Sequence, residues 1–79
     1  MIVELKNKIS ILEVTLKKRN NKSFSFFEKL LNEINEGFVD EAVDSILSSY
    51  AIVQYADFDY KEEALFEEIW NIAEKIRNK

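Results

Sequence analysis

The sequence predicts an all-α protein, a compact bundle of about four short helices in a single domain of residues 1–79. One glycine and no proline leave few positions that would break a helix. The composition, 47% hydrophobic and 33% charged residues, is typical of a folded helical domain and not of a disordered chain. Apolar residues also recur every three or four positions in four successive segments, which is the spacing of amphipathic helices.

The first segment covers residues 2–19. Its apolar positions are Ile2, Leu5, Ile9, Leu12 and Leu16. Residues 12–16 and 23–26 also alternate between apolar and polar side chains on either side of Asn20-Asn21, which is typical of a β-hairpin. An N-terminal hairpin followed by two or three helices is therefore an alternative fold. The helix is favoured because it accounts for more of the apolar positions.

The second segment begins near Ser23 or Ser25. Ser25 and Glu28 have the spacing of a capping box, in which the two side chains accept hydrogen bonds from free backbone N–H groups. Gly37 provides a natural helix end, since glycine tolerates a left-handed backbone conformation. The expected apolar face consists of Phe27, Leu30, Leu31 and Ile34.

The third segment runs from about residue 38 to 54, and the fourth begins at Asp59. The third has a buried stripe at Val39, Ala42, Val43, Ile46, Leu47, Tyr50 and Val53. Asp59 and Glu62 form a second capping-box pattern at the start of the fourth segment. Its apolar seam consists of Leu65, Ile69, Ile72 and Ile76.

Several kinds of chemistry are excluded by composition. Without cysteine or histidine there is no disulfide, no zinc site of the usual kind, no thiol nucleophile and no histidine acid–base catalysis. Asp57, Asp59 and Glu68 fall at positions 1, 3 and 12 of a calcium loop, but Lys61 and Glu62 occupy positions that require a ligand and a glycine. We therefore expect no enzyme activity, no metal and no cofactor.

The expected location is the cytoplasm. No apolar run is long enough to span a membrane. Residues 1–8 contain a glutamate and two lysines, and they do not resemble a signal peptide.

The charge distribution favours a basic protein as partner. Residues 1–22 contain six basic and two acidic side chains, whereas residues 33–68 contain eleven acidic side chains and one lysine. An acidic field of this kind attracts basic proteins and repels nucleic acid, so no nucleic-acid partner is expected. The alternative interpretation is that the acidic residues are simply the solvated faces of helices.

The aromatic residues also point to a binding surface. Residues 55–60 place three aromatic and two acidic side chains in a connection, a composition typical of interface hot spots. In the alternative interpretation, Phe58 closes one end of the bundle. The candidate partner-binding residues are Glu36, Asp40, Glu41, Asp44, Tyr55, Asp57, Phe58, Asp59 and Tyr60.

Two stretches, residues 35–47 (NEGFVDEAVDSIL) and 57–69 (DFDYKEEALFEEI), resemble small helical toxin-immunity proteins, in particular the Maf-type polymorphic-toxin immunity family. The resemblance spans roughly residues 5–76 and lies in hydrophobic spacing and a few acidic positions. It implies a cytoplasmic antitoxin that binds a cognate secreted toxin domain, often a nuclease, and occludes its active-site groove. It assigns no individual residue to that role.

The sequence thus leaves two hypotheses. The first is an immunity protein whose acidic surface binds a basic toxin domain. The alternative is a self-associating helical adaptor or regulatory protein, without an enzyme target, that buries its surplus aromatic residues and the seam from Leu5 to Leu16 in a homodimer.

Overall fold

The computed structural model describes residues 1–78, apart from the side chain of Val53, and in that range contains five helices and no strand. The helices are α1 (Ile2–Lys18), α2 (Phe24–Asn35), α3 (Val39–Leu47), the single turn α4 (Ile52–Tyr55) and α5 (Tyr60–Arg77). The all-α class is confirmed. The hairpin alternative is wrong, because residues 12–18 complete α1 and the next residues form the turn into α2.

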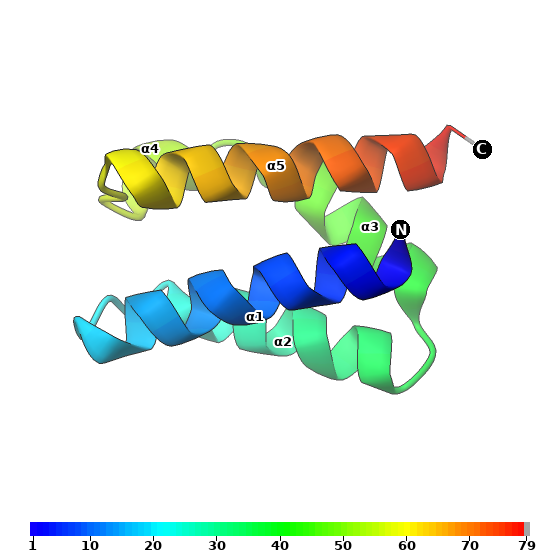
Figure 1. Ribbon diagram of the computed structural model, residues 1–79, viewed down its shortest axis with the longest axis horizontal. Coiled ribbons are helices and arrows are strands. Elements are labelled where there is room, and N and C mark those ends of the chain that lie inside the picture. Colours follow the sequence, from blue (N-terminus) through cyan, green and yellow to red (C-terminus); the bar gives the residue numbers. More distant parts are fainter. Residues whose placement is uncertain (79) are drawn as a thin grey trace.

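The four longer helices form two layers. Figure 1 shows α1 and α5 lying antiparallel in the nearer layer, with α2 and α3 behind them. Each long helix packs against two others: α1 and α3 both contact α2 and α5. The molecule measures 33 × 21 × 18 Å, and both termini lie at the same end of its long axis (Figure 1).

The core is a single cluster between these layers. It contains Leu5, Ile9, Leu12 and Leu16 of α1, all fully buried, so this seam is not available for a homodimer. Ile2 was expected in the seam, but its side chain is 45% exposed because it lies in the first turn of α1, at the end of the bundle. The other core members are Phe27, Leu30, Ile34, Ala42, Val43, Ile46, Phe66, Ile69, Ile72 and Ala73.

The start of α2 differs from the expected capping box. The helix begins at Phe24, and neither Ser23 nor Ser25 caps it through a side-chain acceptor. The Ser25 hydroxyl donates instead to the Lys22 carbonyl at 3.1 Å. The side chain of Asn21 orders this turn by accepting from the Ser23 N–H at 2.9 Å. The capping-box prediction was therefore wrong at Ser25, because the preceding asparagine forms the turn.

The predicted third helix is broken in two. α3 ends at Leu47, and the Ser49 hydroxyl donates to the Ile46 carbonyl at 3.0 Å. Adjacent serines compete with the helix for backbone hydrogen bonds, which favours a turn there. The turn places Tyr50 against Trp70 and Phe66, with ring centroids 5.7 and 6.1 Å apart, although Tyr50 remains 48% exposed. Val53, the last residue of the predicted stripe, lies outside the described side chains.

The capping box of α5 is confirmed. The Asp59 carboxylate accepts from the Glu62 N–H at 2.8 Å, and the Glu62 carboxylate accepts from the Asp59 N–H at 2.9 Å. Among the described helices, none combines the length and the apolar character needed to cross a membrane.

Candidate protein-binding surface

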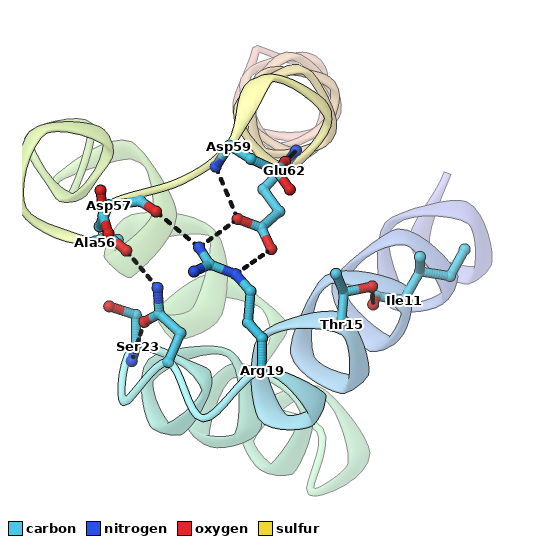
Figure 2. A network of polar contacts seen from close by, with 9 residues as sticks. Ile11, Thr15, Arg19, Ser23, Ala56, Asp57, Asp59 and Glu62 are labelled. Carbon is cyan, nitrogen blue, oxygen red and sulfur yellow. Dashed lines mark hydrogen bonds and ion pairs between the residues drawn. The ribbon is translucent and has the colours of Figure 1, made fainter.

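An ion pair joins the end of α1 to the start of α5. The Arg19 guanidinium donates from Nε and Nη2 to the two carboxylate oxygens of Glu62, at 2.7 and 2.6 Å. Nη2 also donates to the Asp57 carbonyl at 2.7 Å. Figure 2 shows Arg19 reaching between Glu62 and the segment that precedes α5. Residues 43 positions apart in the sequence are thereby tied together.

The two partners of this ion pair differ in burial. The Glu62 side chain is 2% exposed, whereas Arg19 is 37% exposed at the rim. A buried carboxylate is costly without a charged partner and hydrogen bonds, and here both are supplied. The hydrogen bonds to Glu62 raise the pKa of Arg19 above its ordinary value, so the guanidinium stays charged throughout the physiological range.

A second contact fixes the connection between α4 and α5. The Asn21 amide nitrogen donates to the Ala56 carbonyl at 2.5 Å, which ties the α1–α2 turn to the residue before Asp57. The backbone of Asp57 adopts φ 55°, a left-handed conformation that residues other than glycine rarely take. Contacts from Arg19 and Asn21 on either side hold this conformation.

Four of the predicted binding residues gather at this connection, and we call Tyr55, Asp57, Asp59 and Tyr60 the aromatic corner. All four are exposed, and the exposed fractions of the two tyrosines are 80% and 88%. The main chain of the corner is fixed by Arg19 and Asn21, while its tyrosine rings project into solvent. Of the Asp59 carboxylate oxygens, one is engaged in capping α5.

Phe58 lies apart from this surface although it is in the same connection. Its side chain is partly buried, with its ring centroid 6.3 Å from that of Phe27 and 6.0 Å from that of Phe66. The structure therefore places Phe58 at the edge of the core.

The other predicted residues lie at the opposite end of the molecule. Asp44 forms an ion pair with Arg77, the last residue of α5, and Asp40 lines the same hollow. Glu36 and Glu41 are exposed near the connection between α2 and α3, at the end where the termini lie (Figure 1). The 18 residues of α5 separate the two groups, which corresponds to roughly 27 Å. The nine candidates do not form one surface.

Two further glutamates extend the aromatic corner. Tyr60, Glu63, Ala64 and Glu67 line a shallow hollow on the side of α5 that faces solvent. The spacing of four between Glu63 and Glu67 signals in the sequence that they share a helix face. The contact between Arg19 and Glu62 has no such signal, because nothing local connects the two positions.

Metal chemistry finds no support at this surface. Within residues 1–78, no three acidic side chains come together in a way that could hold a metal ion. Glu62 lies within the stretch from Asp57 to Glu68 that was compared with a calcium loop, and its carboxylate accepts hydrogen bonds from Arg19.

Comparison of the chain with family models, curated proteins and solved structures finds no match.

Proposed function

We propose that the chain is an immunity protein that acts in the cytoplasm and neutralises a cognate secreted toxin domain, a nuclease, by occluding its active-site groove. The observation that carries this proposal is the pair of tyrosines, 80% and 88% exposed, beside carboxylates on a fixed main chain. The resemblance of residues 35–47 and 57–69 to small immunity proteins supplies the class of partner.

The chemistry of the aromatic corner suits a basic protein. Tyrosine supplies a large contact area with few rotatable bonds, and it is enriched among the residues that dominate binding energies. Its ring face also attracts lysine and arginine side chains. Arg19 and Asn21 hold the carbonyls of Asp57 and Ala56, which lie between the two tyrosines, so this connection loses little backbone freedom on binding.

Electrostatics support the same partner. The chain has a net charge of −4, and Glu63 and Glu67 continue the acidic surface from the aromatic corner along α5. A nuclease groove is basic because it binds phosphates. Complementary charges accelerate encounter, and added salt weakens this effect.

The test is capture of proteins from the native host by the tagged chain, with identification by mass spectrometry over a range of salt concentrations. We expect one basic protein with nuclease activity, whose recovery falls as salt rises. Its nuclease activity should then be inhibited by the purified chain. Replacing Tyr55 and Tyr60 together by alanine should weaken binding at least about tenfold.

A matched pair of charge reversals locates the surface. Glu63→Lys with Glu67→Lys should weaken binding, and the remaining binding should depend less on the salt concentration. Glu36→Lys with Glu41→Lys makes the same change of charge at the opposite end of the molecule and should leave binding unchanged. The two variants are matched because Glu41 lies in the first turn of α3, as Glu63 lies in the first turn of α5. Circular dichroism checks that both variants fold. Recovery of no basic nuclease, or equal binding by the tyrosine variant, contradicts the proposal.

A further inference from the structure

The exposed apolar side chains are concentrated on α1. Within the described residues, five of the nine large apolar side chains with high exposure lie in the first 14 positions: Met1, Ile2, Val3, Ile11 and Val14. Single exposed apolar side chains are ordinary, but a concentration of them on one element marks an interaction surface.

Three of these side chains share one face of α1. Val3, Asn7, Ile11, Val14 and Lys18 follow each other at intervals of four, four, three and four, the spacing of a single helix face. The core side chains Leu5, Ile9, Leu12 and Leu16 follow the opposite face. We call the first set, together with Glu4, the outer face of α1. Val3 is 72% exposed, Ile11 56% and Val14 42%.

The neighbouring helices border this face without burying it: Ile11 lines a hollow together with Lys61 and Leu65 of α5, and its side chain remains exposed. Lys17 lies over the Phe24 ring on the side of α2, 5.6 Å from its centroid, and Lys8 pairs with Glu68 on the side of α5 at 3.6 Å. The outer face lies between these two flanks. In residues 1–78, Glu4 and Lys18 are exposed and form no ion pair.

We propose that the outer face of α1 is the interface of a homodimer, in which α1 packs antiparallel against α1 of a second copy with Ile11 on the two-fold axis. Ile11 then meets Ile11 of the second copy, and the two Val14 side chains flank that contact. This interface is independent of the aromatic corner and of the proposed toxin.

Charge complementarity selects a second copy of this chain in that orientation. Glu4 and Lys18 lie seven positions before and after Ile11, so the two-fold axis places Glu4 of each copy opposite Lys18 of the other. The arrangement contains two such pairs by symmetry. Parallel helices would instead stack Lys18 on Lys18, which is repulsive.

The dimensions suit a reversible dimer. α1 has 17 residues, roughly 25 Å, and therefore runs along most of the 33 Å length of the molecule. Contact along one helix lies at the small end of interface sizes, so we expect association in the micromolar range.

The test measures the dimer dissociation constant by sedimentation equilibrium for five chains: wild type, Ile11→Lys, Glu4→Lys, Lys18→Glu and the double variant Glu4→Lys/Lys18→Glu. Ile11→Lys should abolish dimerisation. Each single charge reversal should weaken it about tenfold by turning two attractive pairs into repulsive ones. The double variant restores opposite charges and should recover most of the wild-type affinity.

The double variant separates this effect from damage to α1. Both reversals oppose the helix dipole, so any loss of helix stability would be larger in the double variant than in either single one. Lys22→Glu, in the turn after α1, is the matched control and should dimerise like the wild type. A wild-type chain still monomeric at about 1 mM overturns the proposal. So does a dimer that survives Ile11→Lys, or a double variant weaker than both single ones.

Discussion

At the scale of single residues, the contact between Arg19 and Glu62 holds the α4–α5 connection in place. Glu62 serves twice: its carboxylate caps the backbone at Asp59 and also accepts two hydrogen bonds from Arg19. The carboxylate is buried, so its hydration is lost on folding and must be replaced by these contacts. Removing the arginine leaves a buried charge with no opposite charge beside it.

Arg19→Met should therefore lower the free energy of unfolding, by less than the loss of a fully buried pair would because Arg19 lies at the exposed rim. Chemical denaturation measures this change. Arg19→Met/Glu62→Gln is the informative companion, since the neutral amide still caps Asp59 without a buried charge, and it should recover part of the loss. Wild-type stability for Arg19→Met would show that the pair contributes nothing.

The exposed tyrosines, unlike Arg19, should contribute to binding and not to stability. Tyr60 is 88% exposed, so Tyr60→Ala should change the free energy of unfolding by less than about 0.5 kcal/mol. The same substitution should weaken binding of the captured partner. A large loss of stability in denaturation experiments would instead assign Tyr60 to packing.

At the scale of elements, the ends of the helices are decided by a few backbone positions. α2 ends at Asn35, and Gly37 follows its C-cap residue Glu36 with a φ of 90°, in the left-handed region. The Phe38 N–H then donates to the Glu33 carbonyl at 2.8 Å. This is the behaviour of a glycine that terminates a helix. Asn20, the second residue after α1, takes a similar conformation with φ 60°. Both positions turn the chain sharply enough for consecutive helices to pack against each other.

Gly37→Ala should lower the free energy of unfolding by about 1 kcal/mol. A Cβ at this position would meet no atom within 4 Å, so the cost comes from the backbone conformation alone. Thermal or chemical denaturation measures it. Gly37→Asn should cost less, because asparagine tolerates the left-handed region better than alanine. Equal stability of the alanine variant and the wild type would contradict this explanation.

At the scale of the whole molecule, stability depends on one small core. Phe66 is fully buried at its centre, and its ring centroid lies 6.0 Å from those of both Phe27 and Phe58. Aromatic pairs at such distances add to the stability gained by burial. A domain of this size has a net stability of roughly 3–5 kcal/mol, so it cannot tolerate a large cavity.

Phe66→Ala should consequently be unfolded at 25 °C, because truncating a buried phenylalanine costs roughly 3–5 kcal/mol. Phe66→Leu keeps most of the volume and should remain folded with a lower melting temperature. Near-UV circular dichroism and thermal denaturation distinguish these outcomes. Cooperative unfolding of the alanine variant would mean that the core is more stable than its size indicates.

The helices could be predicted from the sequence where apolar periodicity and local signals agree. The seam from Leu5 to Leu16 and the capping box of Asp59 and Glu62 are confirmed, because both depend on residues three or four positions apart. Ser25 and the turn after Leu47 were mispredicted because short side-chain contacts, from Asn21 and Ser49, compete with the helix pattern. A pattern of apolar spacing carries no information about such contacts.

The candidate surface could be predicted only in part. Tyr55, Asp57, Asp59 and Tyr60 are neighbours in the sequence, and they are neighbours in space as well. Asp40 and Asp44 were grouped with them on charge alone, yet they lie beside Arg77 at the far end of α5. Net charge gives the sign of the local field and does not give the position of each side chain.

The sequence by itself therefore determined the all-α class, most helix positions, most of the apolar core and the local order of the aromatic corner, since each depends on periodicity or on adjacent residues. Only the tertiary structure decided the pairing of Arg19 with Glu62, the separation of the acidic residues into two ends, and the exposure of Ile11 opposite a buried seam. These features depend on which helix faces meet, and that is fixed by packing of the whole core rather than by any local segment.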